Sequence, residues 1–154
     1  MLDTPQITST SSQLAAIVPL TVPRSEIQEV MGPGVMEAMK VAGEQGIGPA
    51  GAWFTHHLRL DQEVFDFEIC VPVKAPVTPS GRVIAGEWPA MKVVRTIYQG
   101  PYEDLGDAWG EFIDWIESQG LKTAGDIWER YLVGPESGPD GANYRTELNR
   151  ELLD

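Results

Sequence analysis

The chain repeats one pattern twice, and this repeat constrains its fold more than any other feature. Glu68 and Glu147 occupy matching places 79 residues apart, and the segments that follow Pro23 and Pro101 align as well. A half of this length is too short to bury a core by itself. We therefore expect the two copies to pack around a pseudo-twofold axis, with a central cleft for a ligand where they meet.

The second copy, at about residues 82–154, has the pattern β-α-β-β. A β-prone run at 90–98 ends at Gly100 and Pro101, where a helix begins. Apolar residues then recur at steps of three and four up to Gly120, which indicates one buried helix face. Alternating runs at 127–133 and about 143–148 predict two strands, joined by a turn-rich connection at 134–141.

The first copy, at about residues 13–74, repeats this plan with strands at 14–20, 53–60 and 64–73. Its helix is expected between residues 24 and 44, interrupted at Gly32, Pro33 and Gly34. A linker at 75–81 rich in Pro and Gly joins the copies. Residues 1–12 are polar and are expected to be disordered. The predicted fold is α+β, with two pseudo-symmetric β-α-β-β repeats packed around a central ligand cleft.

Composition limits the classes of partner. The formal net charge of −12 repels nucleic acid phosphates, so direct DNA binding is not expected. The hydrophobic content of 42% suits a globular domain. The N-terminal segment lacks the basic start and long apolar run of a signal peptide or membrane span, so we expect a cytoplasmic protein without membrane contact.

Metal and cofactor chemistry has little support in the sequence. His56 and His57 are adjacent in a predicted strand and point to opposite faces, so they do not share one metal ion. No glycine spacing suits a phosphate loop. The lone cysteine, Cys70, lies in an apolar strand and is predicted to be a core residue. We therefore expect no metal and no cofactor.

Aromatic rings and strand carboxylates are the stronger candidates for a binding site. Glu129 and Tyr131 share one strand face by alternation, opposite Trp128. An acid such as Glu147 is unusual in a short β-prone segment. It has two structural explanations: an edge-strand charge that prevents aggregation, or an ion-pair partner for Arg145 or Arg130. Core packing is the favoured explanation for Trp109, Phe112 and Trp115.

The chain resembles the GyrI-like small-molecule-binding domain, which is also the effector-binding domain of AraC-type and MerR-type multidrug-responsive regulators. The resemblance rests on Ile97-Tyr98-Gln99-Gly100-Pro101-Tyr102, the helix with Trp109 and Trp115, Glu129-Arg130-Tyr131-Leu132 and Arg145-Thr146-Glu147-Leu148. It implies one domain over residues 13–154, with Glu147 as the pocket carboxylate and Tyr131 as its aromatic neighbour. Trp53, Phe54 and Trp88 are further ligand-binding candidates, and Glu68 and Glu129 stay open. The family usually continues with an apolar strand and a proline, whereas here Asn149-Arg150-Glu151 follows Glu147.

The resemblance implies a stand-alone binding protein for lipophilic, aromatic or cationic small molecules. An alternative is a hydrolase of cyclopropane-bearing DNA-alkylating natural products, with Glu147 as general base and Tyr131 as proton donor. A third is a gyrase-interacting inhibitor whose acidic surface imitates DNA. The acids are spread through both halves, which ordinary solubility explains, so this third hypothesis ranks last.

Overall fold

The computed structural model describes residues 2–60, 63–134 and 141–153, and its chain divides into two units. The repeat-one unit comprises Ser11–Ala90, and the repeat-two unit comprises Met1–Thr10 with Met91–Asp154. Each unit has its own antiparallel strands, its own helix and its own apolar core, as an α+β repeat requires. No helix among the described residues combines the length and the apolar character that crossing a bilayer needs.

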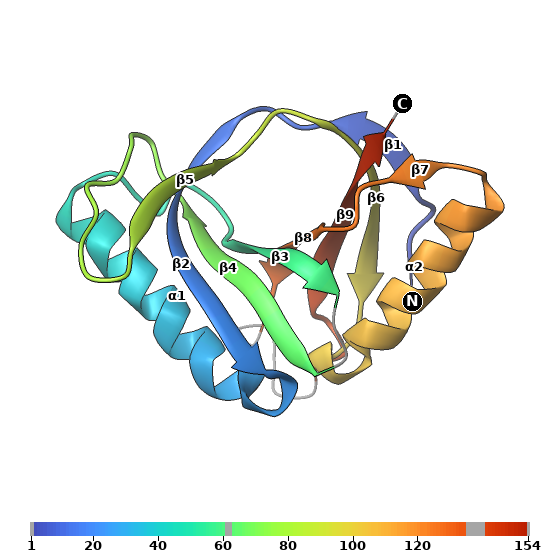
Figure 1. Cartoon of the computed structure of the whole chain (residues 1–154), viewed down its shortest axis with the longest axis horizontal. Coiled ribbons are helices and arrows are strands. Elements are labelled where there is room, and N and C mark those ends of the chain that lie inside the picture. Colours follow the sequence, from blue (N-terminus) through green and yellow to red (C-terminus); the bar gives the residue numbers. More distant parts are fainter. Residues whose placement is uncertain (1, 61–62, 135–140, 154) are drawn as a thin grey trace. The chain divides into compact units, whose positions relative to one another are not determined.

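The repeat-one unit carries its helix on one face of its strands. Its elements are β2 (Gln13–Pro23), a 3-10 turn (Arg24–Glu26), α1 (Ile27–Glu44), β3 (Phe54–Leu60), β4 (Val64–Pro72) and β5 (Ile84–Trp88). The strands pair in the order β3-β4-β2-β5. Helix α1 packs along β2 and β4 (Figure 1). Because side chains alternate along a strand, Val18, Phe67 and Ile69 reach the core under α1 while Glu68 lies on the opposite face.

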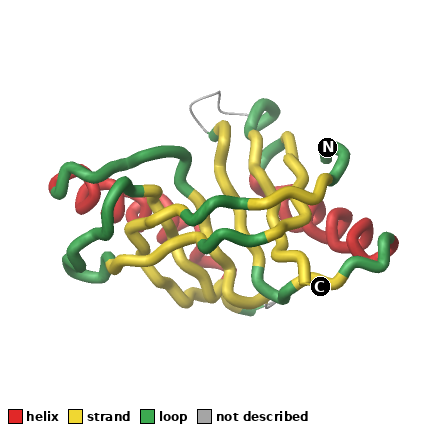
Figure 2. The backbone as a smooth tube through the Cα atoms, turned by 90° about the horizontal axis from the view of Figure 1, so that it is seen from above, coloured by secondary structure: helices red, strands yellow, loops and turns green. Residues whose placement is uncertain are grey.

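The repeat-two unit follows the same plan. Its elements are β1 (Gln6–Ser9), β6 (Lys92–Gln99), a 3-10 turn (Tyr102–Asp104), α2 (Leu105–Ser118), β7 (Lys122–Thr123), β8 (Ile127–Val133) and β9 (Arg145–Leu153). The strands pair in the order β1-β6-β9-β8, and β7 also pairs with β9. Figure 2 shows the helix of each unit in red against its yellow strands. Val94, Phe112 and Leu148 lie in the core beneath α2.

The internal repeat is confirmed in detail. The order β3-β4-β2 in one unit corresponds to β8-β9-β6 in the other. Both helices end in the same way, because Gly46 and Gly120 both have a φ of 69° and close a hydrogen-bonded C-terminal turn. Trp109 and Phe112 are buried in the core and Trp115 packs against it, as predicted.

The structure differs from the expected boundaries at two edge strands. The polar segment 1–12 is not disordered throughout, because β1 pairs with β6 from Gln6 to Ser9. Residues 84–88, which fall within the expected second copy and are not predicted as a strand, form β5, which pairs with β2 and belongs to the repeat-one unit. Edge pairing uses backbone hydrogen bonds, so a polar segment without an apolar pattern still forms a strand.

Two element lengths also differ from expectation. Helix α1 is continuous through Pro33, whose ring is exposed, while Gly34 approaches Ile69 too closely for a side chain there to fit without a shift. β9 continues to Leu153, five residues beyond the expected end, because Glu151 pairs with Val93 and the final residues pair with β7. Most of the connection expected at 134–141 lies outside the described residues.

Replacing Pro33 by alanine is expected to stabilise the protein. Proline inside a helix lacks one N–H and crowds the carbonyl four residues earlier. Pro33→Ala should therefore raise the free energy of unfolding by about 1 kcal/mol or more, measured by urea denaturation. The control is Met36→Ala at an exposed position of the same helix, expected to change stability by less than about 0.5 kcal/mol. A less stable Pro33→Ala variant would contradict this account of α1.

Candidate functional site

A group of polar side chains lies on the face of the repeat-two strands that points away from α2. Glu147 on the central strand β9 is directly opposite Arg130 on β8 and Ile97 on β6. Directly opposite residues in an antiparallel pair present their side chains on the same face. Leu148 points the other way, into the core beneath α2. Three neighbouring strands thus contribute side chains to one surface around Glu147.

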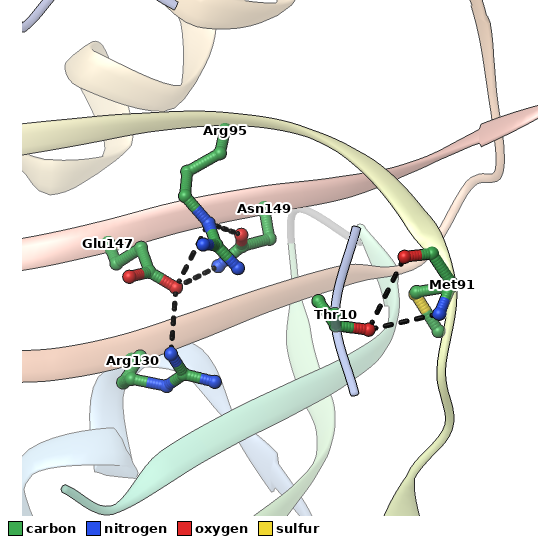
Figure 3. Close-up of polar contacts among 6 residues, drawn as sticks. All are labelled: Thr10, Met91, Arg95, Arg130, Glu147 and Asn149. Carbon is green, nitrogen blue, oxygen red and sulfur yellow. Dashed lines mark hydrogen bonds and ion pairs between the residues drawn. The ribbon is translucent and has the colours of Figure 1, made fainter. Parts of the chain in front are cut away.

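The polar contacts converge on a single carboxylate oxygen. Glu147 Oε1 lies 3.3 Å from Arg95 Nε and 3.3 Å from Arg130 Nη1. Asn149 Nδ2 donates to the same oxygen at 3.0 Å, and Arg95 Nε also donates to Asn149 Oδ1 at 2.6 Å. Figure 3 shows the two guanidinium groups approaching the carboxylate from different strands. We refer to Arg95, Arg130, Glu147 and Asn149 as the Glu147 cluster.

Burial and charge distinguish the members of the Glu147 cluster. Glu147 is 6% exposed and Asn149 is fully buried. The arginine side chains are 25% and 29% exposed. Burial lowers the pKa of Arg130 from its ordinary value; Glu147 opposes this shift, and the nearby charge of Arg95 adds to it. The Glu147 carboxylate therefore lies beside two positively charged groups.

The apolar part of the same face comes from the same strands. Ile97 is half-buried beside Glu147, and Trp128, opposite Asn149, is buried. A mostly apolar surface with a few placed polar groups is typical of small-molecule sites. This face therefore has the chemical character of a site for an organic ligand.

Tyr131 does not neighbour Glu147, in contrast to the expectation from the resemblance. Tyr131 is opposite Thr146, one position away in the register, so its side chain lies on the helix face. There its hydroxyl donates to Glu129 Oε1 at 2.5 Å, and Trp109 Nε1 donates to Glu129 Oε2 at 2.6 Å. The predicted shared face of Glu129 and Tyr131 is correct, and both side chains are buried under α2.

The other predicted aromatic residues belong to the repeat-one unit. The rings of Phe54 and Trp88 are 5.1 Å apart between centroids, and both are almost fully buried. Trp53 is partly buried and packs against the repeat-one core. Within their own unit these three residues contribute to packing.

Glu68 is the counterpart of Glu147 in the repeat-one unit. It is opposite His56 on β3, as Glu147 is opposite Arg130 on β8, and His56 Nδ1 lies 3.2 Å from Glu68 Oε1. Each repeat therefore places an acid and a basic group at the same register position of its last two strands. The two copies differ in which basic residue occupies this position.

Sequence reasoning missed Arg95 and Asn149 as site residues and considered Arg130 only as a structural partner. Arg130 does pair with Glu147. Arg95 had one available signal: it lies between Val94 and Thr96 in a strand, so alternation places it on the face opposite the core. No local signal indicated that β6 would lie beside β9.

Cys70 is a core residue, as the sequence predicted. It is 1% exposed, and its thiol lies 3.7 Å from the carbonyl oxygen of Glu68. Burial raises the pKa of the Cys70 thiol well above its ordinary value, and the charge of Glu68 adds to this shift. Among the described residues, no group of three His, Cys, Asp or Glu side chains is arranged to hold a metal ion.

Comparison with known proteins identifies the family. The model of the GyrI-like small molecule binding domain matches residues 5–149, so the chain belongs to this family. No curated protein matches the chain by sequence.

Solved structures share the fold at low identity. The cryo-EM structure of the EcmrR–DNA complex has a TM-score of 0.86 at 22% identity; the match covers 98% of this chain but 57% of that chain, so this chain spans little more than half of it. The crystal structure of the EcmrR C-terminal domain has a TM-score of 0.85 at 22% identity, with 98% of both chains covered.

A more distant structure is that of SAV2435 bound to tetraphenylphosphonium. It has a TM-score of 0.70 at 13% identity and covers 98% of this chain and 94% of that chain. A hydrolase from Listeria innocua has a TM-score of 0.63 at 12% identity and covers 97% and 91%. At these identities, the similarity establishes the fold.

Glu129→Gln is expected to destabilise the protein. Both carboxylate oxygens of Glu129 accept a hydrogen bond in a buried place, whereas an amide retains only one oxygen and turns an NH2 group toward a donor. The expected loss is about 1–3 kcal/mol in the free energy of unfolding, measured by urea denaturation. Glu111→Gln, at an exposed position of α2, is the matched control and should be near neutral. Equal behaviour of the two variants would show that the buried contacts contribute nothing.

Cys70 is expected to resist thiol reagents in the folded protein. A buried thiol with a raised pKa provides little thiolate, which is the reactive form. Ellman's reagent should label Cys70 slowly in buffer and completely in denaturant. A Ser80→Cys variant adds one exposed thiol as an internal control and should show one fast and one slow reaction. Fast labelling of Cys70 itself would show that β4 opens readily.

Proposed function

We propose that this domain binds lipophilic, flat aromatic small molecules on the sheet face around the Glu147 cluster. The observation that carries the proposal is a partly buried polar cluster beside the apolar side chains of Ile97 and Trp128, in a family of small-molecule-binding domains. The apolar surface of Ile97 and its neighbours supplies burial, and the polar cluster orients the ligand. The tetraphenylphosphonium bound by SAV2435 is a lipophilic cation with aromatic rings, so this neighbour supports a lipophilic, aromatic ligand and is also consistent with a cationic one.

A cationic ligand has weaker support in this chain than the resemblance suggested. Glu147 would have to attract the cation. Its oxygen Oε1, however, already faces Arg95, Arg130 and Asn149. A cation that approaches Oε1 would have to displace a guanidinium group. We therefore propose that the ligand is lipophilic and aromatic, and this proposal does not specify its charge.

Hydrolysis of a strained ring is less well supported by the geometry. The alternative mechanism required Glu147 and Tyr131 to act on one substrate, but the two side chains lie on opposite faces of the sheet. Tyr131 instead donates its hydroxyl hydrogen to Glu129. The acids that would imitate DNA are spread along the chain, so an inhibitor acting on gyrase also lacks a specific supporting feature.

The proposal is tested by calorimetric titration with a neutral flat probe, naphthalene-2-carboxamide. Saturable binding at one site per chain is expected. Ile97→Ala removes apolar surface beside Glu147 and should weaken binding roughly five-fold, since about 1 kcal/mol of contact is lost. Ile7→Ala, the same change at an exposed position of β1, is the control and should bind as the unmodified protein does.

Two further results would redirect the proposal. Absence of saturable binding would contradict the proposed function. Equal weakening in the Ile97→Ala and Ile7→Ala variants would show that the ligand does not bind beside Ile97.

Mass spectrometry after incubation with a cyclopropane-bearing alkylator separates binding from turnover. Recovery of the unchanged compound is expected, and a product heavier by one water would favour the hydrolase.

A further inference from the structure

The terminal nitrogens of Arg95 are available as hydrogen-bond donors. Within the described part of the chain, Arg95 donates one hydrogen bond, from Nε to Asn149 Oδ1 at 2.6 Å, and its ion pair with Glu147 also involves Nε, 3.3 Å from Oε1. Nη1 and Nη2 donate no hydrogen bond to any described residue. The side chain is partly exposed, so a ligand on this face can reach these N–H groups.

The contacts at Nε hold the Arg95 guanidinium in one orientation. Asn149 is fully buried, and its amide is fixed from both sides: Oδ1 accepts from Arg95, and Nδ2 donates to Glu147 Oε1 at 3.0 Å. Figure 3 shows the Arg95 side chain extending toward Glu147 and Asn149. Because the side chain is ordered before a ligand arrives, less entropy is lost when it donates to one.

The same guanidinium lies beside an apolar part of the face. Ile97 is two residues from Arg95 on β6, so the two side chains share one face and their positions are about 6.6 Å apart along the strand. Glu147 is directly opposite Ile97, so the contact with Glu147 draws the Arg95 side chain toward the level of Ile97. A flat fused-ring molecule that lies on Ile97 therefore has its edge within reach of Nη1 and Nη2.

A carbonyl group conjugated with the ring is the acceptor that suits these donors. Conjugation keeps the carbonyl in the plane of the ring, so its oxygen is at the edge of a molecule that lies flat on the face. The guanidinium donates from a planar, rigid fork, and its charge strengthens a hydrogen bond to a neutral oxygen. The ligand itself needs no charge, because Glu147 is already the charged partner of Arg95.

We propose that the site takes flat aromatic molecules with a conjugated carbonyl group, such as aryl ketones, quinones and lactams, whose oxygen accepts hydrogen bonds from Arg95 Nη1 and Nη2. This proposal rests on the proposed function and adds the functional group that the site recognises. Arg95 determines the specificity, and Asn149 is the positioning residue that orients it.

The test compares two neutral probes of nearly the same shape, 2-acetylnaphthalene and 2-isopropenylnaphthalene, in which a CH2 group replaces the carbonyl oxygen. Equilibrium dialysis with the full chain should show about ten-fold tighter binding of the ketone than of the alkene. A purely apolar site would give the opposite order, because burying a carbonyl group without a donor costs free energy.

Infrared spectroscopy measures the hydrogen bond directly. The carbonyl of 2-acetylnaphthalene is labelled with a heavy carbon isotope, so that its stretching band is separated from those of the protein. Donation to the oxygen weakens the C=O bond, so the band of the bound ketone should lie at a lower frequency than in a hydrocarbon solvent. In the Arg95→Met variant, the band should move back to a higher frequency.

Variants assign the contact to Arg95. Arg95→Met keeps an extended apolar side chain without donors, and it should abolish the preference for the ketone, chiefly by weakening ketone binding. Arg95→Lys keeps the charge without the planar fork and should retain only part of the preference. Asn149→Ser removes the acceptor that orients Nε and should lower the preference several-fold. Arg82→Met makes the same change in the repeat-one unit and is the matched control.

The outcomes separate this proposal from the proposed function. If the two probes bind equally, or the alkene binds more tightly, carbonyl recognition is wrong and the proposed function stands. If neither probe binds, and naphthalene-2-carboxamide does not bind either, the proposed function fails and carbonyl recognition fails with it.

Two results would overturn the assignment to Arg95. One is a preference for the ketone that persists in Arg95→Met, and the other is an equal loss of preference in Arg82→Met. Circular dichroism and melting curves show whether each variant is folded. If Arg95→Met does not fold, Arg95→Lys takes its place, and an unchanged carbonyl frequency in that variant would overturn the assignment.

Discussion

The register of β9 between β6 and β8 is the constraint on which the repeat-two unit depends. Leu148 on one face completes the core beneath α2, and Glu147 on the other face gathers its donors from both neighbouring strands. Because successive side chains alternate, a shift of one residue would bury Glu147 under the helix and expose Leu148. The ladder hydrogen bonds that hold β9 in place therefore also assemble the site.

Glu129 and Glu147 are both buried in this unit, but they have different kinds of partner. The partners indicate a structural role for Glu129 and a proposed binding role for the surface around Glu147. Glu129 is hydrogen-bonded by the uncharged side chains of Trp109 and Tyr131, which tie α2 to β8. Glu147 is paired with charged guanidinium groups that stay partly exposed. The first arrangement satisfies every carboxylate oxygen inside the core. The second leaves charged groups partly exposed on the opposite face of the sheet, where we propose that a ligand binds.

The internal repeat explains why both units carry an acid in the last strand of the β-α-β-β pattern. Glu68 with His56 and Glu147 with Arg130 occupy corresponding register positions. Of these two acids, only Glu147 has a second arginine beside it. This arginine is Arg95 on β6, the strand that pairs with β9 on the side opposite β8. The duplicated fold thus provides the same position twice, and the side chains of the neighbouring strands decide its charge.

The sequence by itself determined the β-α-β-β plan of each copy, the end of the second helix at Gly120, and the shared face of Glu129 and Tyr131. These features follow from local periodicity and turn chemistry, which act over a few residues. Only the tertiary structure decided that a polar segment forms β1, that β5 joins β2, and that Arg95 and Asn149 meet Glu147. Pairing and register between strands distant in sequence arise from backbone ladders and a shared core, and no local pattern in one strand specifies its neighbour.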